Sequence, residues 1–191
     1  MSNRYIILHK LYDVLSQFTE EVPGQRTLVE FGLPRGLYAA GRLDRDSEGL
    51  LLLTNDGPLI KKLLEPGMGH ERTYLVQVEG IPNLEAIAQL ETGVTIQGYR
   101  TLPAKAKILK EEPALPLREP PIRVRKSIPT SWIELTLREG KNRQVRHMTA
   151  AIGHPTLRLV RTAIGPITLG NLRPGQWREL TKSEIANLKK G

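Results

Sequence analysis

Four consecutive leucines, Leu50–Leu53, follow directly after a charged stretch. From Arg42 to Gly49 nearly every residue is charged or small, and Leu43 is the one large apolar side chain. A short unbroken apolar run bounded by turn residues predicts a strand buried on both faces, and Asn55-Asp56-Gly57 supplies the closing turn. Charges held against a core cost free energy unless they are paired. We therefore expect a buried strand preceded by a charged loop with a chemical role.

The composition limits the class of protein. A chain of 191 residues is long enough to bury a core as one domain or two compact half-domains. The net charge of +8 favours a polyanionic partner, nucleic acid before a membrane surface, with a basic protein lacking such a partner as the alternative. The absence of cysteine excludes disulfides and thiolate chemistry. Because no apolar run is long enough for a signal peptide or a membrane span, we expect a soluble cytoplasmic protein without a membrane partner.

Periodicity predicts an α+β fold of eight or nine short strands, mostly in hairpins, with a few helices. One predicted helix begins near Pro58, buries Leu59, Ile60, Leu63 and Leu64, and stops at Pro66-Gly67. A second is capped by Asn83 and places Leu84, Ile87, Ala88 and Glu91 at helical spacing; a third, over 143–152, is capped by Asn142. Thr181-Lys182-Ser183-Glu184 has the form of a capping box before a last helix. Alternation in Tyr74, Val76 and Val78 predicts a strand.

Asp44 is the carboxylate best placed for chemistry, because it lies between Arg42 and Arg45. A neighbouring cation typically lowers the pKa of an Asp by about 1–3 units, which favours an ionised nucleophile or base. An exposed charged turn is the alternative interpretation. Asp46 and Glu48 alternate with Asp44 and could join it around Mg²⁺. The interleaved arginines oppose a cation, so we expect no metal site.

A second cluster of functional residues spans Glu139 to Met148, where Lys141, Arg143 and Arg146 crowd the start of the predicted helix. Cations are unfavourable at that end of the helix dipole, which indicates an anionic ligand or, alternatively, arginines paired with nearby acids. Residues 118–146 hold eight basic and three acidic residues, so much of the excess charge lies in this segment. It includes most of the long proline-rich loop 111–130, which carries Arg118, Arg123, Arg125 and Lys126.

Together these segments resemble the pseudouridine synthases. Residues 41–51, Gly-Arg-Leu-Asp-Arg-Asp-Ser-Glu-Gly-Leu-Leu, are similar to the catalytic motif of that family, 72–76 to its tyrosine motif and 140–148 to its third motif. The resemblance implies one catalytic domain over 1–191 without the N-terminal S4-type domain of many relatives, built as a mixed, mostly antiparallel sheet with flanking helices and a central RNA-binding cleft. Residues 126–132 and 38–40 are most similar to the branch that modifies ribosomal RNA of the large subunit, the 23S rRNA. Lys10-Leu11 stands where the family usually has Lys-Pro, which affects only the local turn.

The resemblance also implies residue roles. Asp44 is the expected catalytic aspartate, Tyr74 stacks on the target base, and Arg146 pairs with Asp44, with Arg143 as the second choice. Arg42 fills the gap left by the flipped uridine. The remaining expected contacts to ribosomal RNA come from Arg45, Arg143, Lys141, Arg123, Arg125 and Lys126. The implied reaction detaches uracil N1 from ribose C1′ and rejoins the ring through C5 without cofactor or metal, and it leaves open whether Asp44 is nucleophile or base.

Two other functions remain open from the residues alone. A non-catalytic RNA-binding or ribosome-assembly module would share the basic charge and its salt dependence. A metal-dependent nuclease could be built on Asp44, Asp46 and Glu48. We expect the chain to act as a monomer, with no protein partner indicated by its sequence.

Overall fold

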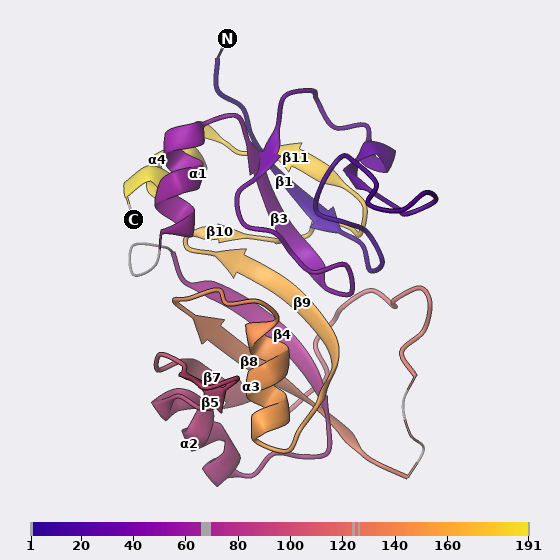
Figure 1. Ribbon diagram of the computed structural model, residues 1–191, viewed down its shortest axis with the longest axis vertical. Coiled ribbons are helices and arrows are strands. Elements are labelled where there is room, and N and C mark those ends of the chain that lie inside the picture. The colour runs from indigo at the N-terminus through magenta and orange to yellow at the C-terminus, as the bar shows by residue number, and fades with distance from the viewer. Residues whose placement is uncertain (1, 66–69, 124, 126, 191) are drawn as a thin grey trace. The chain divides into compact units, whose positions relative to one another are not determined.

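A computed structural model describes residues 2–65, 70–123, 125 and 127–190 (Figure 1). The chain forms two compact units, the first made of Met1–His70 with Arg161–Gly191 and the second of Glu71–Val160. Strand β9 (Thr156–Ile164) belongs to the second unit up to Val160 and to the first from Arg161. The expectation of one catalytic domain over 1–191 stays a prediction.

The first unit is organised around β3 (Glu48–Thr54), the strand that contains the leucine run. All seven residues of β3 are buried, which confirms the predicted two-sided strand. Strand β1 (Tyr5–Lys10) pairs antiparallel with β3, from Tyr5 opposite Thr54 to Lys10 opposite Gly49. On its other edge β1 pairs with β11 (Trp177–Glu179), while β2 (Tyr38–Ala39) pairs with β3 and β10 (Ile167–Thr168) with the end of β9. The charged loop therefore ends inside a fully buried strand pair.

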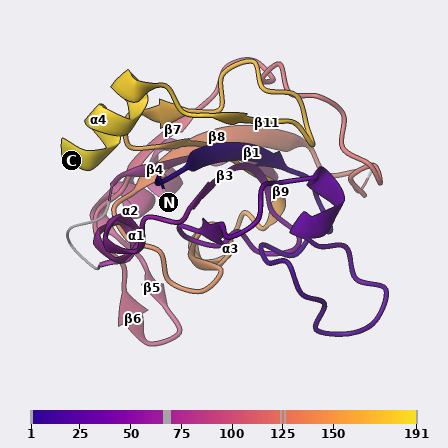
Figure 2. The same ribbon diagram turned by 90° about the horizontal axis from the view of Figure 1, so that it is seen from above.

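Two helices pack beside this core, as Figures 1 and 2 both show. Helix α1 (Gly57–Leu64) begins as predicted, with Asp56 accepting a hydrogen bond from the Leu59 N–H at 3.1 Å. Its buried side chains are Leu59 and Leu63, while Leu64, expected in the same stripe, is 49% exposed; the expected stop at Pro66-Gly67 lies outside the described residues. Helix α4 (Lys182–Lys190) starts with the predicted capping box, in which the side chains of Thr181 and Glu184 each accept the other's backbone N–H. A short 3₁₀ helix, Leu28–Phe31, lies earlier in the chain.

The second unit contains an antiparallel sheet in which β8 (Thr130–Leu137) lies between β4 (Arg72–Glu79) and β7 (Lys105–Ile108). Tyr74, Val76 and Val78 of β4 are buried, as their alternation predicts, and Gln77 is buried as well. Strands β5 (Thr95–Ile96) and β6 (Tyr99–Arg100) form a separate small hairpin (Figure 2). Strands β2, β6 and β10 have two residues each and carry too little periodicity to be found in a sequence, which is why the described part of the chain has more strands than expected.

Helix α2 (Leu84–Thr92) begins after Asn83, the predicted cap, and ends at Gly93. It buries Ala86, Ile87 and Leu90, while Leu84 is 84% exposed. Apolar residues lie at helical spacing on two faces of α2, so tertiary packing determines which face is buried. Helix α3 (Gln144–Ala151) lies against one face of the β4–β8 sheet (Figures 1 and 2).

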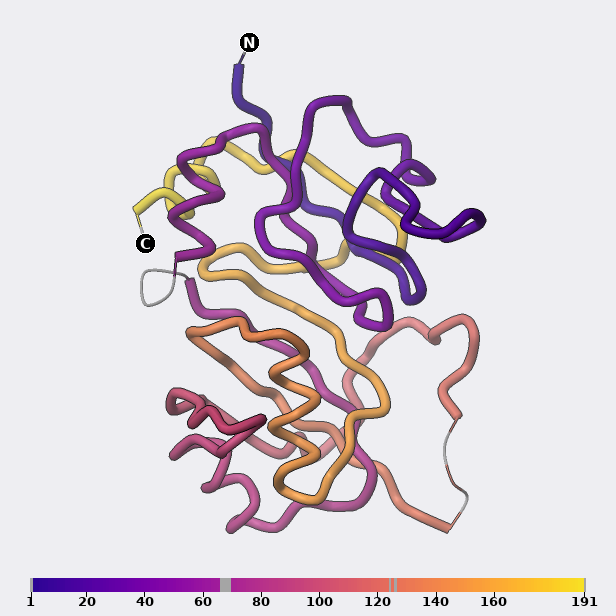
Figure 3. The backbone as a smooth tube through the Cα atoms, viewed as in Figure 1, coloured from indigo at the N-terminus to yellow at the C-terminus, as the bar shows by residue number. Residues whose placement is uncertain are grey.

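Figure 3 traces the long connection between β7 and β8. Its described residues contain no helix or strand, as expected for the proline-rich loop. The loop begins where the Leu109 N–H donates to the Trp132 carbonyl at 2.8 Å. Further along, the buried side chain of Arg158 donates to the Pro116 carbonyl at 2.9 Å. The observed architecture, mostly antiparallel strands with helices beside them, confirms the predicted α+β class.

Candidate active site

Asp44 lies in the loop between β2 and β3 of the first unit. The residue is half-buried, and its carbonyl accepts a hydrogen bond from the Ser47 N–H at 3.0 Å, which closes a four-residue turn. The side chain therefore stands on a short turn that runs directly into a buried strand. A carboxylate in such a place can act as a nucleophile or as a base.

The backbone on both sides of Asp44 is held by two residues of the preceding segment, one through its side chain and one through its backbone. The Ser16 hydroxyl donates to the Leu43 carbonyl at 2.7 Å and accepts the Leu43 N–H at 3.0 Å. The Asp13 N–H donates to the Arg45 carbonyl at 2.8 Å. Both neighbours of Asp44 in the chain are thus fixed by hydrogen bonds from residues about thirty positions earlier, and nothing in their local sequence spacing indicated this.

Lys10, the last residue of β1, is completely buried below this loop. Its ammonium group donates to the carbonyls of Val14 at 2.6 Å, Leu11 at 2.8 Å and Arg45 at 3.3 Å. Burial lowers the pKa of Lys10 to about 7, although nearby carboxylates led by Glu48 oppose the shift. From the sequence alone, only a local turn was expected at this lysine. A lysine at the end of a strand that opens with four apolar residues, Tyr5 to Leu8, was the signal for a buried role.

The two arginines that flank Asp44 are both exposed and contact acids of the preceding segment. Arg45 lies 2.6 Å from the Asp13 carboxylate, and Arg42 lies 3.8 Å from that of Glu21. Exposed ion pairs contribute at most about 1 kcal/mol, so an RNA phosphate can replace the acid in either pair. The roles of Arg42 and Arg45 as RNA contacts stay predictions.

Tyr74 lies on β4 of the second unit, opposite Leu135 of β8. Its side chain is largely buried, with 8% of the residue exposed. It shares this face of the strand with Val76 and Val78, so its ring is held by core packing. A rigid aromatic ring with a small exposed edge suits contact with a flat base.

The third motif forms the turn before α3. Arg143 adopts a left-handed conformation with φ 51° and takes the N-cap position without a capping side chain, so the expectation that Asn142 caps the helix was wrong. The described first turn of α3 carries no acidic residue and includes the half-buried Arg146. The helix dipole and the arginines both favour an anion here, as the sequence predicted.

Glu139 and Gln144 hold this turn in place. Gln144 donates to the Glu139 carboxylate at 2.6 Å and accepts the Lys141 N–H at 2.9 Å. The same carboxylate accepts the Tyr99 hydroxyl at 2.7 Å and the Leu102 N–H at 2.8 Å. The exposed Lys141 ammonium lies 4.3 Å from the centre of the Tyr99 ring. The turn that carries the arginines is therefore tied to the β5–β6 hairpin.

The proline-rich loop supplies the other predicted RNA contacts. Arg123 is exposed, and Arg125 lies 3.7 Å from the Glu79 carboxylate. Lys126 lies outside the described residues. The predicted residues thus fall in two groups, Asp44 with its flanking arginines in the first unit and the remaining described ones in the second. The pairing of Asp44 with Arg146 stays a prediction.

The described residues contain neither a metal-binding cluster nor a membrane-spanning helix. Within them, no group of three or more histidine and acidic side chains is placed to hold a metal ion. No helix in the same residues is long and apolar enough to cross a membrane.

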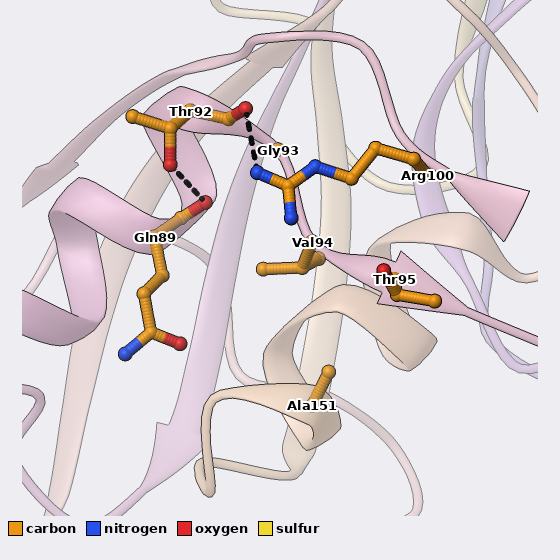
Figure 4. Close-up of a pocket in the computed structure, with 7 residues that line it drawn as sticks. All are labelled: Gln89, Thr92, Gly93, Val94, Thr95, Arg100 and Ala151. Carbon is orange, nitrogen blue, oxygen red and sulfur yellow. Dashed lines mark hydrogen bonds between the residues drawn. The ribbon is translucent and has the colours of Figure 1, made fainter.

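A pocket of about 220 Å³ in the second unit is lined by Gln89, Thr92, Gly93, Val94, Thr95, Arg100 and Ala151 (Figure 4). None of the predicted site residues lines this pocket, so it has no place in the predicted chemistry.

Comparisons of sequence and of structure with known proteins lead to the same family. Residues 4–151 match the sequence model of a family described as RNA pseudouridylate synthase. The chain is 54% identical to the ribosomal large subunit pseudouridine synthase E of Xanthomonas campestris, covering 91% of this chain and 93% of that protein. It is 51% identical to the protein of the same name from Vibrio parahaemolyticus, covering 94% and 74%. It superposes with a TM-score of 0.80 on a crystal structure of pseudouridylate synthase that is 30% identical, covering 98% of this chain and 74% of that one.

Proposed function

The chain belongs to the RNA pseudouridylate synthase family, and we propose that it isomerises uridine to pseudouridine in the 23S ribosomal RNA of the large subunit. The observation that carries this proposal is the loop of Asp44. It combines the catalytic motif of the family with a half-buried carboxylate on a turn whose backbone is fixed on both sides. The choice of 23S rRNA is supported by the high identity to relatives named as large subunit enzymes.

In the proposed reaction Asp44 assists cleavage of the bond between ribose C1′ and uracil N1, as a nucleophile at C1′ or as a base at the 2′ position. The detached ring turns and C5 bonds to C1′. N1 gains a proton and C5 loses one, so the isomerisation is balanced without an oxidant, a cofactor or a metal ion. The target base must first leave its stack, which costs a few kcal/mol that contacts in the pocket and at the backbone offset.

Tyr74 and Arg146 complete the proposed catalytic set. The packed ring of Tyr74 would stack on the flipped uracil and assist proton transfer at C5. Arg146 would pair with Asp44 and keep it ionised, with Arg143 as the second choice. Support for these roles comes from the family motifs and from the way Gln144 and Glu139 fix the turn before α3.

The remaining basic residues are proposed to bind the RNA backbone. Arg42 would occupy the space left by the flipped uridine. Arg45, Lys141, Arg143, Arg123, Arg125 and Lys126 would contact phosphates. Because Arg45 and Arg125 lie in ion pairs with carboxylates, phosphate oxygens replace those carboxylates on binding, and affinity should fall as salt rises.

We place the protein in the cytoplasm, where ribosomal RNA is modified, and expect it to act as a monomer. Pseudouridines in 23S rRNA should be mapped by carbodiimide-blocked primer extension in cells with and without the protein. One position that is modified only when the protein is present would support the proposal. Identical maps would refute it.

A further inference from the structure

Arg161 is a buried arginine of the first unit that lies outside the three motif segments 41–51, 72–76 and 140–148. Only 2% of the residue is exposed. Its Nε donates to the Leu50 carbonyl at 2.8 Å, and its Nη2 donates to the Gly41 carbonyl at 3.2 Å. Gly41 and Leu50 lie on opposite sides of Asp44 in the chain. One guanidinium group therefore joins the two ends of the loop that carries the proposed catalytic aspartate.

The backbone of Arg161 contacts the same loop. Gly49 has φ 101°, and a Cβ atom at this position would lie 2.2 Å from the Arg161 carbonyl oxygen and 2.7 Å from its nitrogen. Gly49 thus allows β3 to approach β9 at this point. The loop is held to Arg161 through both main chain and side chain.

An arginine is energetically unfavourable at a position where a side chain only has to fill the core. Burying its charge is unfavourable unless each donor finds an acceptor. What the guanidinium adds is a planar set of donors at fixed separation, which lysine with its single nitrogen lacks. This chemistry fits a requirement to keep two carbonyl groups at a set distance.

The charge of Arg161 also acts on Lys10, which is buried next to this loop. Its field lowers the pKa of Lys10, while the carboxylates of Glu48, Asp46 and Asp44 raise it. Arg161 and the three carboxylates therefore act on the same buried amine, whose nitrogen also donates to the Arg45 carbonyl of this loop.

We propose that Arg161 is a positioning residue, whose guanidinium holds Gly41 and Leu50 together and thereby keeps Asp44 in its reactive geometry. The proposal rests on the proposed uridine isomerisation. Arg161 itself does not touch the substrate. Small displacements of a catalytic group can lower a rate about a hundredfold without changing affinity.

The test compares Arg161→Lys with Arg158→Lys as a matched control. Arg158 lies three residues earlier on β9, is also buried, and also donates to a backbone carbonyl, that of Pro116 in the second unit. Total ribosomal RNA carrying tritium at uridine C5, from cells lacking the protein, is the substrate. Tritium release is measured in single turnover at saturating protein, and the Kd of the same RNA is measured separately.

Arg161→Lys should lower the single-turnover rate constant at least about tenfold while the Kd stays within about threefold. Arg158→Lys should leave the rate constant at saturation unchanged. Hydrogen exchange of the Ser47 amide should accelerate in Arg161→Lys, while that of the Ile7 amide in β1 stays protected. A rate constant near that of the wild type, in a folded Arg161→Lys protein, would overturn the proposal.

If Arg161→Lys does not fold, Arg161→Gln, which buries no charge, is measured in the same way. Failure of both variants to fold would assign Arg161 to stability alone and overturn the positioning role. If the wild type releases no tritium from this RNA, the proposed isomerisation fails. The exchange measurement then still tests whether Arg161 holds the loop.

Discussion

Gln144 donates a hydrogen bond to the carboxylate of Glu139 at 2.6 Å, across the turn that precedes α3. Glu139 in turn accepts hydrogen bonds from Tyr99 and the backbone of Leu102. The arginines assigned to the reaction therefore depend on a buried glutamine and a shared carboxylate. This relationship gives the third family motif a physical purpose, because its glutamine builds the turn that presents Arg146.

We expect Gln144→Ala to destabilise the protein by about 1–3 kcal/mol, because it removes the partner of Glu139 and of the Lys141 N–H. It should also lower the rate of pseudouridine formation by more than its loss of folded protein explains. Urea unfolding and single-turnover assays measure the two effects. Gln89→Ala, an exposed glutamine on α2, is the control and should change neither. Wild-type stability in Gln144→Ala would contradict the role of Gln144 in holding the turn before α3.

Gly49→Ala should destabilise the protein by about 3 kcal/mol or more, since the new Cβ would overlap the Arg161 backbone and the residue has φ 101°. Gly36→Ala separates the two causes. Gly36 also has a positive φ, 78°, but no atom lies within 4 Å of its added Cβ. Its substitution should cost only about 1 kcal/mol in the free energy of unfolding. Equal losses in the two variants would show that the close approach at Arg161 is unimportant.

Lys10 should make stability depend on pH. Its pKa is about 7 in the folded protein and 10.5 in the unfolded chain, so the unfolded chain binds more protons between these values. Stability therefore rises with pH across this window. Relative to Lys10→Met, the free energy of unfolding of the wild type should rise by about 2 kcal/mol from pH 7 to pH 9. Urea unfolding of both proteins at each pH measures this difference, and a constant difference would contradict the lowered pKa.

Asp56 should stabilise the protein through its ionised form. The Tyr5 hydroxyl, 2.6 Å away, is the largest influence that lowers the pKa of this largely buried carboxyl to about 2, assisted by Lys189 and the Leu59 N–H. The stabilisation is complete above the ordinary pKa near 3.8 and is lost as the pH falls toward 2. Asp56→Asn, which keeps the capping oxygen, should be less stable than the wild type at pH 6 by about 1–2 kcal/mol. The gap should close near pH 2, and a gap that persists there would show that charge is not its cause.

Local signals in the sequence predicted local structure well. The leucine run of β3 and the capping box of α4 depend on neighbours in the chain, and both are confirmed. The missed features depend on distant residues. Ser16 reaches Leu43, and Arg161 reaches Leu50 across more than a hundred positions. Spacing within one segment contains no information about such hydrogen bonds.

The errors have the same origin. Asn142 was a reasonable cap by residue type, but the left-handed Arg143 follows it and starts α3 one residue later. Leu84 has helical spacing with Ile87, yet the packing of α2 buries Leu90 and leaves Leu84 exposed. For the site, sequence motifs located the loop of Asp44, while the supporting residues Lys10, Ser16 and Arg161 became evident only in the structure.

Asp44 is the residue on which the proposed reaction depends most directly. Asp44→Asn and the matched variant Asp46→Asn should each be incubated with ribosomal RNA from cells lacking the protein, with pseudouridine and RNA affinity both measured. Asp44→Asn should lose at least about a thousandfold in turnover and bind RNA within a few-fold of the wild type, while Asp46→Asn keeps its activity. Turnover by Asp44→Asn close to that of the wild type would contradict the account.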